Sequence, residues 1–104
     1  MGQATKSDIA IFFNSDSVPS ELASSTGVEQ TMLKHYYETN PEAVGKPDIT
    51  ISGYEQYDGY IELVLYSTRR ANLDFQIDLL NDYLETYHDD IIEEVTFDTW
   101  VQVD

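Results

Sequence analysis

The alternation of apolar and polar residues predicts several short strands. The first is an apolar run that ends in the polar stretch 14–17, a pattern typical of a buried strand followed by a turn. Asp58 and Gly59 separate two further runs, which predicts a β-hairpin. Four segments therefore have strand character: residues 9–13, 49–52, 60–68 and 95–103.

Residues 18–39 predict a first helical region in two pieces, because Gly27 interrupts the pattern. Thr26 and Glu29 have the spacing of a capping box, which predicts that the main helix covers residues 28–38. This helical region and the second helix, described next, complete the predicted order of helices and strands along the chain.

A second helix is expected from Leu73 to about His88, with Asn72 as its N-cap. At about 100° per residue, its apolar side chains fall on one side, where they are expected to pack on a sheet. This apolar stripe contains Leu73, Ile77, Leu80, Leu84, Tyr87 and Ile91, widened by Phe75, Leu79 and Tyr83.

The order β-α-β-β-α-β predicts an α+β fold, a ferredoxin-like sandwich. In this fold a four-stranded antiparallel sheet carries two helices on one face. We expect one domain over residues 7–104, preceded by a flexible start at residues 1–6. The fold itself says little about function, because it supports many activities.

The charge of the chain narrows the choice of partner. It has 20 acidic and 5 basic residues, a net charge of −15, and no lysine or arginine after Arg70. Phosphate backbones and anionic membranes repel such a surface, so we expect neither direct nucleic-acid binding nor membrane binding. The chain has no cysteine and no apolar run long enough to span a bilayer, which favours a cytoplasmic protein.

The polar side of the second helix forms a regular row of carboxylates, which we call the ridge. Its members fall within an arc of about 80°, and the row is about 22 Å long. The ridge contains Asp74, Asp78, Asp82, Glu85 and Asp89, and is followed along the chain by Asp90, Glu93 and Glu94. Amphipathic helices commonly have acids on their wet side, but no basic residue is mixed in here. We therefore expect the ridge and these following acids to bind a basic partner.

The sheet offers a second candidate surface. Strand alternation is expected to send aromatic side chains to the face opposite the helices, where they would support self-association, including a homodimer, or partner docking. This prediction depends on the register, since a shift of one residue inverts it. The expected interface aromatics are Tyr54, Tyr60, Tyr66 and Trp100, with Phe12 and Val64 on the same face.

Catalytic signals are weak in this sequence. There is no glycine-rich phosphate loop and no nucleophile elbow, and His35 and His88 stand on different helices. His88 has four acids close by in the sequence, but the calcium-loop pattern is missing. We therefore expect no enzyme activity, no catalytic residues, no cofactor and no metal site.

In its small size, negative charge, lack of cysteine and regular ridge, the chain resembles phage-encoded inhibitors of the DNA-mimic class, among them anti-restriction and anti-CRISPR proteins. The resemblance implies a stoichiometric inhibitor, acting in the bacterial cytoplasm, whose ridge enters the basic channel of a nucleic-acid-binding host-defence or DNA-processing complex. Two alternatives remain open. One is an assembly module that uses the aromatic sheet face, and the other is an adaptation to high salt, which predicts unfolding at low ionic strength.

Overall fold

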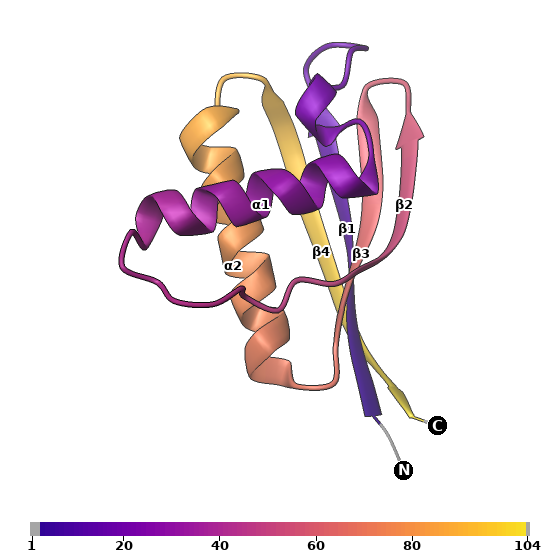
Figure 1. The fold of residues 1–104 in the computed structure, drawn as a ribbon. Coiled ribbons are helices and arrows are strands. Elements are labelled where there is room, and N and C mark those ends of the chain that lie inside the picture. The colour runs from indigo at the N-terminus through magenta and orange to yellow at the C-terminus, as the bar shows by residue number, and fades with distance from the viewer. Residues whose placement is uncertain (1–2, 104) are drawn as a thin grey trace.

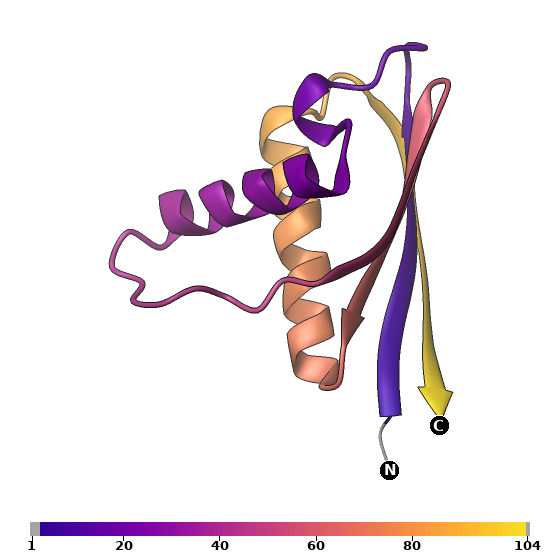
Figure 2. The ribbon, with the colours of Figure 1, turned by 45° about the vertical axis from the view of Figure 1, so that its right-hand side comes forward.

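Two helices lie on one face of a four-stranded antiparallel sheet with the strand order β2-β3-β1-β4 (Figures 1 and 2). The structure, a computed structural model, describes residues 3–103. This topology confirms the predicted ferredoxin-like β-α-β-β-α-β sandwich. In chain order the elements are β1 (Gln3–Phe13), a short 3-10 helix η1 (Ser20–Leu22), α1 (Ser25–Thr39), β2 (Ile51–Tyr57), β3 (Tyr60–Ser67), α2 (Arg70–Tyr87) and β4 (Ile92–Val103).

The two strands nearest the chain ends are longer than the hydrophobic pattern indicated. β1 begins at Gln3, so residues 3–6 pair within the sheet, although a flexible start was expected there. β4 begins at Ile92, which pairs with Phe13. Backbone hydrogen bonds between strands do not require apolar side chains, so these polar stretches pair in the sheet although the hydrophobic pattern does not predict it. Residues 1, 2 and 104 lie outside the described part of the chain.

The start of α1 differs from the predicted capping box. Ser24 is the N-cap, and its Oγ accepts a hydrogen bond of 2.9 Å from the N–H of Gly27. Gly27 lies inside the first turn and does not interrupt the helix. A Cβ at this position would lie 2.6 Å from the carbonyl oxygen of Glu21, so glycine allows η1 to pack closely against the helix start.

The start of α2 also differs from the prediction: the helix begins at Arg70 and not at Leu73, and Asn72 is not its N-cap. Asn72 instead donates a 3.0 Å hydrogen bond to the carbonyl of Asp48 and accepts one from the buried Gln76. The Gln76 amide also accepts a hydrogen bond from Thr50 N–H at 2.9 Å and donates one to the Tyr66 carbonyl at 3.0 Å. This one side chain therefore joins α2 to β3 and to Thr50, the residue that directly precedes β2.

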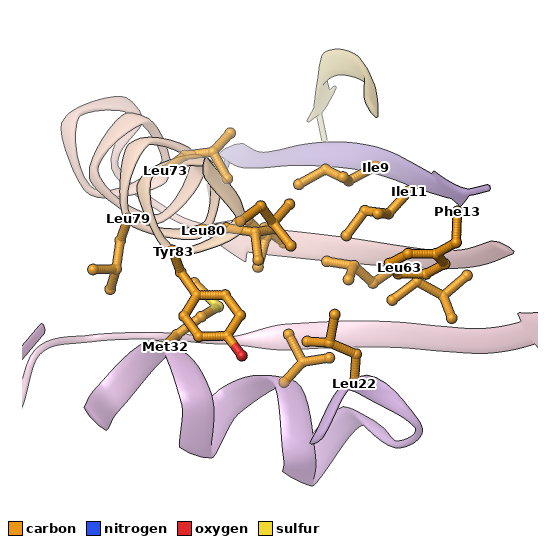
Figure 3. Close-up of a cluster of buried hydrophobic side chains, with 14 residues drawn as sticks. Ile9, Ile11, Phe13, Leu22, Met32, Leu63, Leu73, Leu79, Leu80 and Tyr83 are labelled. Carbon is orange, nitrogen blue, oxygen red and sulfur yellow. The ribbon is translucent and has the colours of Figure 1, made fainter. Parts of the chain in front are cut away.

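The hydrophobic core fills the layer between the sheet and the helices (Figure 3). The central strands β1 and β3 contribute alternate residues, as the period of two predicts. The buried apolar side chains are Ile9, Ile11, Phe13, Leu22, Val28, Met32, Ile61, Leu63, Leu65, Leu73, Leu79, Leu80, Tyr83 and Leu84. Burying one such large aliphatic side chain contributes about 1.5–3 kcal/mol. One face of the sheet is thus committed to the core.

Candidate functional site

No helix in residues 3–103 covers the other face of the sheet, which we call the open face (Figure 2). The cross-strand register shows which side chains project to it, because directly paired residues share a face. Phe12 pairs with Tyr60, which places both on this side, away from the buried Ile11 and Ile61. Counting alternately from these positions, the open face contains Lys6, Asp8, Ala10, Phe12, Glu55, Tyr57, Tyr60, Glu62, Val64, Tyr66, Glu94, Thr96, Asp98 and Trp100.

Aromatic side chains gather at both ends of the open face. Near the β2–β3 turn, the Tyr60 ring stacks on Phe12 and Tyr57, with centroid distances of 5.0 and 4.6 Å. At the end near the chain termini, Trp100 and Tyr66 flank Lys6, whose Nζ lies 5.5 Å from the Trp100 ring centroid. Both ends therefore offer ring faces on which a cation or a second ring can stack.

The middle of the open face is acidic. Asp8 on β1 pairs directly with Asp98 on β4, and Glu55 on β2 pairs directly with Glu62 on β3. All four side chains are exposed and line a shallow depression of about 530 Å³. Like charges directly opposite each other destabilise a sheet, so this arrangement carries a cost for the fold.

No basic side chain in the described part of the chain forms an ion pair with these four carboxylates. The nearby Lys6 sits over Trp100 instead. Trp100 Nε1 donates a 3.3 Å hydrogen bond to Asp8, and the Tyr57 hydroxyl donates one to Glu55. The bond to the Glu55 carboxylate raises the pKa of Tyr57 to about 12. The negative charge of the depression thus remains available to a ligand.

Tyr54, one of the four predicted interface aromatics, does not lie on the open face. The β2–β3 register shifts between Ile51 and Gly53, so Tyr54 pairs with the core residue Leu63 and faces the helices. Its hydroxyl donates a 2.5 Å hydrogen bond to the carbonyl of Leu22, and burial raises its pKa. The prediction for Tyr54 was wrong because a local bulge inverts strict alternation. Tyr60, Tyr66 and Trp100 do lie on the open face.

Five side chains of the open face were missed as candidate site residues from the sequence: Asp8, Glu55, Tyr57, Glu62 and Asp98. Asp8 and Glu55 stand alone among neutral neighbours in the sequence, and they meet other acids only across strands. The sequence signal for these residues was their polar character at positions within the strands. The strand register is needed to tell which face of the sheet each of them occupies. The two like-charged pairs therefore become visible only in the folded chain.

The side of β4 that faces the helical layer is also partly exposed. Phe97 and Val101 lie on that side by their register, yet they are 40% and 49% exposed. β4 is an edge strand, and the helices contact mainly β1, β2 and β3. The helices therefore leave these two side chains partly uncovered.

All five ridge carboxylates are exposed, but only four of them stand on α2, on its side away from the sheet. The prediction that Asp89 continues the helical row was wrong, because α2 ends at Tyr87 and Asp89 lies in the following turn. Two of the five have internal partners. Asp74 accepts a 3.0 Å hydrogen bond from Arg70 Nε, and Asp82 Oδ2 lies 2.5 Å from Nε2 of His35 on α1. The remaining three, Asp78, Glu85 and Asp89, have no cationic partner within the described residues.

The three acids that follow the ridge separate in space. Asp90 lies in the turn after α2, where its carbonyl accepts a 3.0 Å hydrogen bond from the Asn14 side chain. Glu93 and Glu94 belong to β4. Glu94 pairs with Phe12 and belongs to the open face, whereas Glu93 is the unpaired residue at a shift in the β1–β4 register. These eight acids do not form one continuous surface.

Both histidines are packed between helices. His35 is 2% exposed, lies edge-on to Tyr83 and Tyr87, and has no hydrogen-bond partner at Nδ1. His88 Nε2 lies 2.9 Å from Glu21 and 3.0 Å from the Tyr83 hydroxyl. Burial raises the pKa of Tyr83 to about 12. Between residues 3 and 103, no three His, Cys, Asp or Glu side chains come together to hold a metal ion.

No helix in the described part of the chain is long and apolar enough to cross a membrane. No known protein family matches the sequence, and no curated protein does. Solved structures do share its fold. A chain in the crystal structure of A. aeolicus tRNASec in complex with M. kandleri SerRS matches 97% of this protein with a TM-score of 0.52 and 15% identity. This protein spans only 20% of the length of that chain.

Two smaller proteins match along most of their length. Protein SO0527 from Shewanella oneidensis has a TM-score of 0.51 and 12% identity, covering 98% of this chain and 93% of its own. A dimeric ferredoxin-like protein from an uncultured marine organism has a TM-score of 0.51 and 13% identity, covering 97% and 89%. At these identities the similarity establishes the ferredoxin-like fold and nothing about activity.

Proposed function

We propose that this protein is a non-enzymatic acidic binding protein that inhibits a nucleic-acid-binding complex of host defence or DNA processing. The observation that carries the proposal is that, within residues 3–103, no cationic group pairs with Asp78 and Glu85 on the outer side of α2 or with Asp89 in the turn that follows. A surface selected only for solubility mixes both signs of charge. The ridge instead presents one sign on a rigid helix, at positions suited to a basic groove, and the protein would act in the bacterial cytoplasm.

The position of the free carboxylates on a regular helix supports this mechanism. With a rise of about 1.5 Å per residue, Asp78 and Glu85 lie about 10 Å apart along the axis of α2, and Asp89 follows in the turn after the helix. Binding in a lysine- and arginine-lined channel would release counterions, so the affinity should fall steeply as salt rises.

The test is a charge reversal of the three free ridge positions. Tagged wild-type protein would be used to recover nucleic-acid-binding partners from bacterial lysate, with duplex DNA and salt as competitors. The ridge variant Asp78→Lys/Glu85→Lys/Asp89→Lys should lose those partners. Its control, Asp16→Lys/Glu42→Lys/Asp58→Lys, changes the net charge equally at exposed sites elsewhere and should keep them. Equal recovery by both variants would refute the ridge mechanism.

A second candidate function is an assembly module that joins copies or partners through the open face. The stacked rings of Phe12, Tyr57 and Tyr60 favour it, because aromatic residues concentrate at interface hot spots. One protein of the same fold is described as dimeric, which makes self-association a reasonable comparison. Light scattering of the wild type and of Trp100→Ala and Tyr66→Ala tests it. A monomeric wild type would rule out the homodimer.

A further inference from the structure

We infer that the open face of the sheet is a docking surface for a lysine- or arginine-rich polypeptide segment of the partner. The inference rests on the proposed function, from which it takes that the partner is basic. It adds a contact surface separate from the ridge, because the sheet's open face and the helical layer lie on opposite sides of the molecule (Figure 2).

The shape of the open face suits an extended segment. The depression lies in the middle of the sheet, with the aromatic clusters beyond it at both ends. From Tyr60 to Tyr66 along β3 the face extends about 20 Å, at about 3.3 Å per residue. An extended peptide of about six residues covers that length. The floor is β-sheet backbone held on both sides by the ladder, so it is already formed before binding.

Charge identifies the occupant as basic. The pairs Asp8–Asp98 and Glu55–Glu62 set like charges directly opposite each other, and no described lysine or arginine pairs with them. Local rules of folding are broken chiefly where a function requires it. Positively charged side chains bound in the depression would relieve these repulsions.

The aromatic ends favour the same ligand. Lys6 already lies over Trp100, which shows that this face accommodates a cation on a ring. Arginine combines a planar stacking surface with donors for two carboxylate oxygens, so an arginine-bearing segment can use both the rings and the acids.

Self-association by this face is disfavoured on the same grounds. A second copy docked face to face would bring two sets of the four carboxylates together across a partly desolvated interface, where unpaired charges are costly. The occupant is therefore a different chain that supplies positive charge.

A hexa-arginine peptide titrated at physiological ionic strength tests the inference, with Trp100 fluorescence as the readout. Trp100 is the only tryptophan of the chain and lies on the open face, and the peptide has no chromophore of its own. The open-face variant Asp8→Asn/Glu62→Gln/Asp98→Asn and the ridge variant Asp78→Asn/Glu85→Gln/Asp89→Asn each remove three negative charges by near-isosteric changes. Calorimetry gives the affinity of each, and amide shift mapping on the wild type locates the peptide without any substitution.

We expect the open-face variant to lose at least tenfold in affinity and the ridge variant less than threefold. We also expect the fluorescence of Trp100 to change on binding, and shifts to cluster on β1, β3 and β4. Equal losses in both variants, or no binding to the wild type, would overturn the inference. A loss confined to the ridge variant, with shifts on α2, would overturn it as well while leaving the proposed function standing.

Discussion

Nε2 of His35 lies 2.5 Å from Oδ2 of Asp82, which joins α1 to α2 and gives one ridge carboxylate a structural partner. The His35 ring is almost fully buried, whereas the Asp82 side chain is 62% exposed. This contact sits at the boundary between the core and the proposed binding surface. It separates the ridge positions that support the fold from those that are free to bind.

Asp82→Ala should therefore destabilise the protein, whereas Asp78→Ala should not. Removing Asp82 leaves the buried imidazole without its hydrogen-bond partner, which costs about 1–3 kcal/mol. Both changes replace an exposed aspartate on the same helix with the same residue, so helix propensity and net charge are matched. Urea unfolding of the two variants gives the comparison. Equal free energies of unfolding would mean that the His35–Asp82 contact contributes nothing.

Asp98→Asn should stabilise the fold while weakening the proposed binding. It removes the repulsion between Asp8 and Asp98, which are directly opposed on neighbouring strands, and the expected gain is about 0.2–1 kcal/mol. Asp90→Asn, in the exposed turn after α2, removes the same charge without relieving a direct pair and serves as the control. If both changes raise the thermal midpoint equally, the benefit comes from net charge and not from this pair.

Gln76→Leu should be strongly destabilising, although it places an apolar residue in a buried position. The buried amide of Gln76 satisfies the partly buried Thr50 N–H and Tyr66 carbonyl, and leaving a buried polar group unpaired costs about 1–3 kcal/mol. Gln30→Leu on the exposed side of α1 is the matched control and should be nearly neutral. Chemical unfolding measures both. A neutral Gln76→Leu would show that the core tolerates these groups unpaired.

Stability should decrease at alkaline pH, partly through Tyr83. Burial raises its pKa from 10.0 to about 12, so the folded chain keeps a proton that the unfolded chain releases. The stability from this group is fully present below pH 10.0 and is lost as the pH rises through about 12. Tyr83→Phe should flatten that fall, whereas Tyr37→Phe at an exposed position should leave it unchanged. Unfolding free energies measured across this pH range test the assignment to Tyr83. Parallel curves of stability against pH for all three proteins would contradict it.

The element order and the fold class were predictable from the sequence, because the helical and strand periods of the hydrophobic residues are strong signals. The exact ends of the helices and strands were less predictable. Ser24 rather than Thr26 caps α1, because several small polar residues precede that helix and only one has the required backbone geometry. Residues 3–6 join β1 through backbone hydrogen bonds, to which their side chains give no clue.

The candidate binding surfaces were likewise predictable only in part. Four ridge positions follow from the helical period alone and were predictable, but Asp89 lies beyond the end of α2 at Tyr87. The His35–Asp82 contact depends on how the two helices pack. On the open face, Tyr54 was misplaced because the register shift after Ile51 turns it toward the core. The acidic depression was not predictable, since Asp8 and Asp98 are 90 residues apart in the chain and meet only through strand pairing.

The most direct test of the proposed inhibition compares partner binding by the wild type, the ridge variant Asp78→Lys/Glu85→Lys/Asp89→Lys and the control Asp16→Lys/Glu42→Lys/Asp58→Lys, in the presence and absence of duplex DNA. If the protein acts as an acidic decoy, DNA and salt displace the wild type and the control from a basic nucleic-acid-binding partner, and the ridge variant does not bind. A ridge variant that is folded and still binds as the wild type does, or a partner that DNA leaves in place, would contradict the account.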